Sequence, residues 1–117
     1  MASKQEEGRE GEKRAENTLK RAGYKIIEKN FRSRFGEIDI VAEENGCLVF
    51  VEVKKRNTPN FGDPFNAINA RKRQHLIKCA MFYLKSHNSF NRKTRFDVVG
   101  IEGEQVKIIK NAFIVEE

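Results

Sequence analysis

Two acids and a lysine form the most informative pattern in this chain. Asp39 lies in the segment Gly-Glu-Ile-Asp-Ile-Val-Ala (36–42), and Glu52 and Lys54 lie in Cys-Leu-Val-Phe-Val-Glu-Val-Lys-Lys (47–55). A hydrolytic site built on a divalent cation needs these groups, because carboxylates bind the cation and a lysine offsets charge on the reacting group. The three side chains can act together only if the two segments pair in the fold.

The dipeptide between the two segments predicts that they do pair. Asn45-Gly46 favours a two-residue type I′ turn, and therefore a β-hairpin. In the register that this turn sets, Asp39 faces Glu52 and Glu37 faces Lys54. The same register gives one apolar face, made of Ile38, Ile40, Ala42, Val49, Val51 and Val53. Two carboxylates about 5 Å apart between Cβ atoms destabilise a hairpin unless a cation compensates them.

Simpler interpretations of these residues remain open. Glu37 and Lys54 could form a surface ion pair worth less than about 1 kcal/mol, which would leave Lys54 structural. Asp39 and Glu52 could be two solvated acids on a wet face of the hairpin. Three apolar residues on that face indicate partial burial: Val41, Leu48 and Phe50. Because a half-buried acid pair without a cation is costly, we favour the metal site.

The composition bounds the kind of protein. A length of 117 residues suits a single domain (1–117) with one core. Hydrophobic residues make up 38% of the chain, and no apolar stretch approaches the ~20 residues of a membrane span. No apolar signal segment is visible near the start. Cys47 and Cys79 lack metal-like spacing, so we expect free thiols and a cytoplasmic protein.

The basic residues are clustered, and the formal net charge is +6. A single cluster is typical of a solvated surface. Several clusters around an acidic pair suit a polyanionic phosphodiester substrate, because the basic rim binds the backbone while the acids hold cations. The clusters are Lys29, Arg32 and Arg34; Lys54, Lys55 and Arg56; Arg71, Lys72 and Arg73; and Arg92, Lys93 and Arg95.

The hydrophobic pattern predicts helix, three strands, helix, strand and short edge strands. A helix of about twenty residues between the third and fourth strands permits a crossover, so we expect a mixed sheet with helices on its faces. The predicted helices span 5–22 and a segment starting at Asp63-Pro64. The predicted strands are 24–29, the two arms of the hairpin, 95–101, 106–109 and 112–115, with a basic connection over 30–34.

Lys72 and Asp97 allow two interpretations each, and the two histidines allow one. Lys72 interrupts the apolar stripe of the second helix, where it either covers the core edge with its stem or reaches toward the acidic site. Asp97 alternates with apolar neighbours, which favours a structural role over a catalytic one. His75 and His87 have no spaced partners, so no zinc site is expected.

The combined string of motifs resembles a known family. Its parts, in chain order, are Gly36-Glu37-Ile38-Asp39, Phe50-Val51-Glu52-Val53-Lys54, Arg56, Gly62, Lys72 and Arg95-Phe96-Asp97. Together they resemble the YraN family, also called UPF0102, which is similar to Holliday-junction resolvases of the PD-(D/E)xK nuclease superfamily. The match runs roughly over 12–101, and Ile38 stands where the superfamily often has proline. The resemblance implies a restriction-endonuclease-like αβββαβ core with a mixed central sheet flanked by helices.

The resemblance also implies roles for individual residues. Asp39 and Glu52 would bind Mg²⁺ or Mn²⁺, with the main-chain carbonyl of Val53 as a further ligand. Lys54 would position the attacking water and offset charge in the transition state. Glu16 matches the helical acid of resolvase-like members, and Glu12, one turn earlier, is the alternative. The expected nucleic-acid contacts are Arg32, Arg34, Lys55, Arg56, Lys72 and Arg95.

These expectations combine into two functional hypotheses. The first is a metal-dependent endonuclease that hydrolyses phosphodiester bonds of DNA, branched or single-stranded. The second is a non-catalytic nucleic-acid-binding or accessory module that retains the nuclease fold. The first hypothesis includes a homodimer, because symmetric cutting of two strands requires a two-fold axis.

Overall fold

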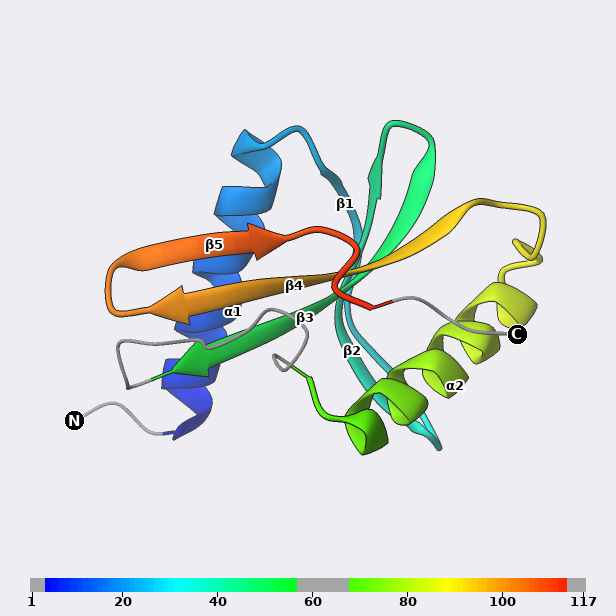
Figure 1. Ribbon diagram of the computed structural model, residues 1–117, viewed down its shortest axis with the longest axis horizontal. Coiled ribbons are helices and arrows are strands. Elements are labelled where there is room, and N and C mark those ends of the chain that lie inside the picture. The colour runs from blue at the N-terminus through cyan, green and yellow to red at the C-terminus, as the bar shows by residue number, and fades with distance from the viewer. Residues whose placement is uncertain (1–3, 57–67, 114–117) are drawn as a thin grey trace.

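The computed structural model describes residues 4–56 and 68–113. Its elements follow the predicted αβββαβ order, with one further strand at the end (Figure 1). They are α1 (Lys4–Arg21), β1 (Lys25–Ser33), β2 (Gly36–Glu44), β3 (Cys47–Arg56), α2 (Ala70–Ser86), β4 (Thr94–Glu102) and β5 (Gln105–Ile109). Neither of these two helices is long and apolar enough to cross a membrane.

The five strands form one mixed sheet in the order β1-β2-β3-β4-β5. β3 and β4 are parallel, and the other neighbours are antiparallel. Residues of β3 alternate between two buried clusters: Leu48 and Phe50 pack with α2, whereas Val49 and Val51 pack with α1. The helices therefore cover opposite faces of the sheet, and α1 passes behind β4 and β5 in Figure 1. The predicted restriction-endonuclease-like α/β fold is confirmed.

The hairpin forms with the predicted turn. Asn45 and Gly46 have φ of 51° and 79°, the positive values that a type I′ turn requires. The ladder of β2 and β3 keeps the predicted register from the Glu44–Cys47 pair to the Ile40–Val51 pair.

Beyond Ile40 the two strands fork, which corrects the predicted pairing. Among the described residues, Asp39 and Glu52 are not ladder partners, and neither are Glu37 and Lys54. The carboxylate of Asp39 instead accepts a hydrogen bond of 2.8 Å from the main-chain amide of Val53. β3 continues along β4 as far as the Arg56–Glu102 pair, so it remains paired with β4 where β2 turns away. The fork opens the sheet at the predicted site.

β1 is longer than predicted, because it continues through most of the basic connection. It pairs with β2 as far as Ser33, with a bulge between Ile26 and Glu28. Asn30 has a left-handed φ of 56°, which asparagine tolerates better than most residues. The ladder of β1 and β2 is also interrupted at Asn30, which lies opposite Asp39, between the pairs Lys29–Ile40 and Phe31–Ile38. Both strands are therefore irregular at the fork.

Two predicted elements differ at their ends. α2 begins at Ala70, where the side chain of the N-cap Asn69 accepts a hydrogen bond from the Lys72 amide at 2.8 Å. The predicted start at Asp63-Pro64 lies outside the described residues. The described part of the predicted last strand is not extended sheet: Ala112 is anchored by its amide to the Phe96 carbonyl at 2.8 Å.

Candidate active site

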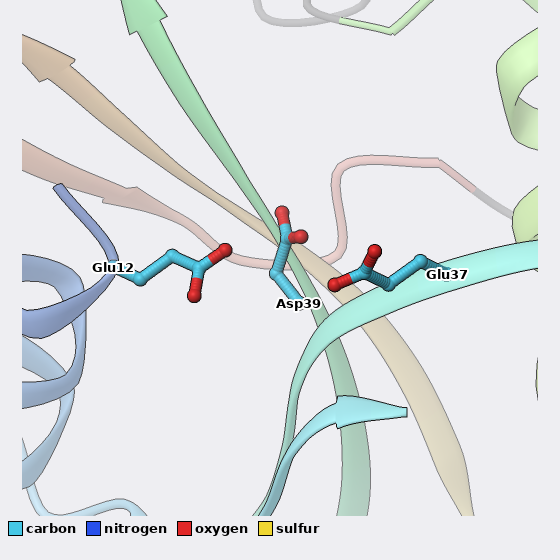
Figure 2. Close-up of side chains that lie close together, drawn as sticks. All are labelled: Glu12, Glu37 and Asp39. Carbon is cyan, nitrogen blue, oxygen red and sulfur yellow. The ribbon is translucent and has the colours of Figure 1, made fainter. Parts of the chain in front are cut away.

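Three acids converge at the fork between β2 and β3. Glu12 comes from α1, and Glu37 and Asp39 come from β2. One carboxylate oxygen of each residue lies within 4.8 Å of the others. Figure 2 shows Glu12 and Glu37 pointing toward Asp39 from opposite sides. Glu37 and Asp39 share a side of β2 because they are two residues apart on a strand. α1 and β2 therefore bring three carboxylates close together.

Glu52 adds a buried acid from β3. It is only 7% exposed. Its Oε1 lies 3.6 Å from Nζ of Lys72, whereas its Oε2 is buried and has no hydrogen-bond partner among the described residues. Burial raises the pKa of Glu52, and the charges of Lys72 and Lys54 only partly oppose this effect. An orphaned carboxylate oxygen at this depth is costly unless something binds it.

Asp39 is the acid whose pKa is most clearly perturbed. Burial raises its pKa to about 7, and the negative charge of Glu52 adds to the effect. The hydrogen bond from the Val53 amide opposes the rise, and Glu12 and Glu37 reinforce it. The other three acids are therefore close enough for their negative charge to act on Asp39.

Asn30 connects two of these acids. With its amide oriented by the hydrogen-bond network, Nδ2 donates to Glu37 Oε1 at 2.8 Å and to Glu12 Oε2 at 3.1 Å. The left-handed backbone of Asn30 places the amide between α1 and β2. Sequence reasoning missed this residue, because neither its backbone conformation nor the fork is visible in the local pattern.

We name Glu12, Glu37, Asp39 and Glu52 the acid cluster. The structure places Glu12 in this cluster, and not Glu16. Glu16 forms ion pairs with Lys20 at 3.1 Å and with Lys29 at 3.3 Å. The hydrogen bond from Lys20 is the main reason that the pKa of Glu16 is lowered. The two glutamates are one turn apart on the same side of α1, so the sequence alone could not choose between them.

The two lysines flank Glu52. Lys72 reaches the acidic site through its contact with Glu52, which settles its two interpretations in favour of the second. Lys54 is half-buried on β3, and its charge lowers the pKa of Glu52. Within the described residues, Glu37 pairs with Arg32 at 3.6 Å and makes no ion pair with Lys54. The simple surface pair considered for Lys54 is therefore absent.

The predicted nucleic-acid contacts do not all lie on one surface. Arg32, Arg34 and Lys55 are exposed, on β1, on the turn after it and on β3. Arg34 lies over the ring of Phe35, 4.9 Å from its centroid. Arg56 ends β3. Lys72 contacts Glu52, and Arg95 lies in a separate group of ion pairs.

Arg95 belongs to an internal ion network at the far end of β2. It donates to Asp97 through Nε and Nη2, both at 2.8 Å, and to Glu44 at 2.8 Å. Tyr24 donates its hydroxyl to Asp97 at 2.7 Å, and Lys110 donates to Glu44 at 2.9 Å. Asp97 is 1% exposed and accepts these bonds inside the fold, which favours the structural role over the catalytic one. We name these five residues the Arg95 network.

The fold and the site together define the class of protein: a restriction-endonuclease-like α/β protein with an acid cluster at the fork of its central hairpin. The chain belongs to the uncharacterised protein family UPF0102, whose family profile matches residues 11–101.

Relatives in that family align over nearly their whole length. A UPF0102 protein of Persephonella marina is 45% identical over 106 residues, covering 91% of each chain. One from Lachnoclostridium phytofermentans is 46% identical over 113 residues, covering 95% of each chain. One from a Sulfurihydrogenibium species is 41% identical over 113 residues, covering 97% of this chain and 98% of the relative.

Proposed function

We propose that this protein is a metal-dependent endonuclease that hydrolyses phosphodiester bonds of DNA at the fork. The observation that carries the proposal is the convergence of Glu12, Glu37 and Asp39 within 4.8 Å, with Glu52 close enough for its negative charge to raise the pKa of Asp39. Such a group of acids opposes folding when all are charged, and a bound cation would remove that cost.

The donor set fits a hard divalent cation. Carboxylate and carbonyl oxygens are the ligands that Mg²⁺ and Mn²⁺ prefer. Asp39 and Glu52 would hold the ion, together with the main-chain carbonyl of Val53, and Glu12 and Glu37 enlarge the set. The buried Oε2 of Glu52 supports this fit, because binding an ion would satisfy it. When bound, the cation polarises the phosphoryl group and acidifies its water.

The neighbouring side chains hold the acids and supply fixed charge. The Val53 amide orients Asp39, and Asn30 bridges Glu12 and Glu37. Lys72 orients Glu52 through its ion pair. Lys54 lies beside the same acid and would offset the negative charge that grows on the phosphoryl oxygens in the transition state.

The surface around the fork suits a polyanion. Arg32, Arg34 and Lys55 are exposed, and the chain carries a net charge of +6. Such charge attracts the DNA backbone and gives salt-dependent affinity. We propose branched or single-stranded DNA as the substrate, with Arg95 left out of the interface because its donors bind Asp97 and Glu44.

Calorimetry and cleavage assays together test the proposal. Wild type and a double variant, Asp39→Asn with Glu52→Gln, are titrated with Mg²⁺ and Mn²⁺ and incubated with branched, single-stranded and duplex DNA. The matched control is Glu10→Gln with Glu104→Gln, which removes the same charge from two exposed acids.

We expect metal binding and metal-dependent cutting in wild type and control, and neither in the double variant. Metal-independent DNA binding by all three proteins, without metal binding or cutting, would overturn the proposal and favour the non-catalytic binding module.

A further inference from the structure

A polar groove runs along α1 beside the acid cluster. Its volume is about 460 Å³, and it lies between α1 and the β1 residues Lys29 and Asn30. Glu12 and Asn30 line the groove and also belong to the fork, since Asn30 donates to Glu12 and Glu37. The groove therefore opens onto the site where the proposed reaction takes place.

The groove follows from the periodicity of α1. Ala15 and Leu19 are fully buried against the sheet, and they fix the orientation of the helix. The helix residues that line the groove recur at helical spacing beside this buried stripe: Arg9, Glu12, Lys13, Glu16, Asn17 and Lys20. A polar stripe on a helix is usually only a solvated face. Here the stripe borders a hollow whose other wall is β1.

The lining of the groove is positively charged. It contains the four basic residues Arg9, Lys13, Lys20 and Lys29 against the two acids Glu12 and Glu16, a net charge of +2. Glu16 is already paired with Lys20 and Lys29. Glu12 points into the acid cluster (Figure 2). Neither acid is therefore placed to repel an anion that enters from the Lys13 side.

The size of the groove limits what can occupy it. Cavities of about 300–1,000 Å³ hold ligands of drug-like size. At about 460 Å³ the groove accommodates a short segment of one nucleic-acid strand. Positively charged grooves that follow the backbone are how proteins hold single strands.

We infer that this groove binds backbone phosphates of a single DNA strand next to the bond that is cut. The main contacts are Lys13 and Lys20, whose exposed ammonium keeps donors beyond its ion pair with Glu16. The inference rests on the proposed nuclease function, and it adds a surface that the basic rim of Arg32, Arg34 and Lys55 does not include. Lys13 and Lys20 are seven residues apart, so both project from the same side of α1 at separate points along the groove.

The test compares two double variants in metal-free buffer containing a chelator. The groove variant is Lys13→Ala with Lys20→Ala. The control is Lys78→Ala with Lys85→Ala, two exposed lysines of α2 at the same spacing. Alanine is the best helix former, so both variants keep their helices. Fluorescence anisotropy measures the affinity for a labelled single-stranded oligonucleotide between about 50 and 200 mM salt.

We expect the groove variant to bind about tenfold more weakly, with a log–log salt slope about 1.4 smaller, because two single-strand phosphate contacts are lost. The control should bind as wild type does. Equal affinity and slope in the groove variant and wild type would overturn the inference, as would an equal loss in the control.

A cleavage assay with Mg²⁺ separates this inference from the nuclease proposal. If wild type cuts DNA and the groove variant binds normally, the groove inference fails while the nuclease proposal stands. If the groove variant loses binding but wild type cuts none of the substrates, the groove still binds DNA and the nuclease proposal fails.

Discussion

β2 carries acids into two groups, one half-buried and one buried, that differ in charge balance. At one end Asp39 lies with Glu12 and Glu37, and its pKa rises to about 7 because of burial and nearby negative charge. At the other end Glu44 lies in the Arg95 network. Burial raises the pKa of Glu44, but hydrogen bonds from Lys110 and Arg95 lower it overall. The same strand therefore presents one unbalanced and one balanced group of acids.

The difference shows how a chain can separate acids that hold the fold from acids that bind something else. In the Arg95 network, Asp97 and Glu44 receive donors from Arg95, Lys110 and Tyr24, all from the same chain. In the acid cluster one oxygen of Glu52 has no partner among the described residues. Buried charges are usually paired, so this second group is where the proposed cation would bind.

The largest expected effect comes from a substitution in the acid cluster. Glu52→Gln removes the most buried acid of the cluster and should lower the rate of metal-dependent DNA cleavage by at least about 1,000-fold, or about 4 kcal/mol. Single-turnover cleavage assays measure the rate, and circular dichroism verifies that the fold is intact. A variant that cuts within tenfold of wild type would remove Glu52 from the catalytic set.

The next largest effect comes from a substitution in the Arg95 network. Arg95→Ala leaves Asp97 buried without its cation and should lower the free energy of unfolding by about 3 kcal/mol. The control is Arg32→Ala, whose side chain is 80% exposed and should change stability by less than about 0.5 kcal/mol. Urea denaturation measures both. Similar stabilities for the two variants would mean that the Arg95 network contributes little.

A pH series sharpens the comparison through Glu44. Glu44→Gln should lower the free energy of unfolding by about 1.5 kcal/mol near pH 7, because a charged acceptor for Lys110 and Arg95 is lost. The folded pKa of Glu44 lies below the ordinary value of 4.5, so its contribution exists above pH 4.5 and disappears on further acidification. The difference between wild type and variant should therefore shrink below pH 4.5. A difference that grows on acidification would contradict this assignment.

Much of the fold could be predicted because its signals are local. Asn45-Gly46 set the turn and the register near it, and Leu48 and Phe50 on the second face of the hairpin indicated its partial burial. The hydrophobic pattern then predicted the order of the remaining elements. Local signals of this kind do not depend on how distant segments pack.

The geometry of the site could not be predicted in the same way. The fork depends on Asp39 bonding to the Val53 amide and on the left-handed Asn30, and both interactions join segments that are distant in sequence. The choice of Glu12 over Glu16 depends on ion pairs between Glu16 and lysines on α1 and β1. Extending the hairpin register in a straight line therefore placed the acids correctly near one another but with the wrong backbone pairing.

The smallest effect reverses the usual sign of a mutation at a buried residue. Asp39→Asn should raise the free energy of unfolding by about 1 kcal/mol in metal-free buffer, because it removes one of several mutually repelling charges. The asparagine carbonyl can still accept the 2.8 Å hydrogen bond from the Val53 amide, so little structure is lost.

Urea denaturation with and without Mg²⁺ measures this effect. Mg²⁺ should stabilise wild type and leave Asp39→Asn nearly unchanged, since a ligand stabilises only a protein that binds it. We expect only the substitution in the acid cluster to stabilise the protein, because it removes repulsion between carboxylates. The equivalent substitution at Glu44 removes attraction to Lys110 and Arg95. If Asp39→Asn destabilised the protein as much as Glu44→Gln does, the two groups of acids would be equally balanced and the contrast between them would fail.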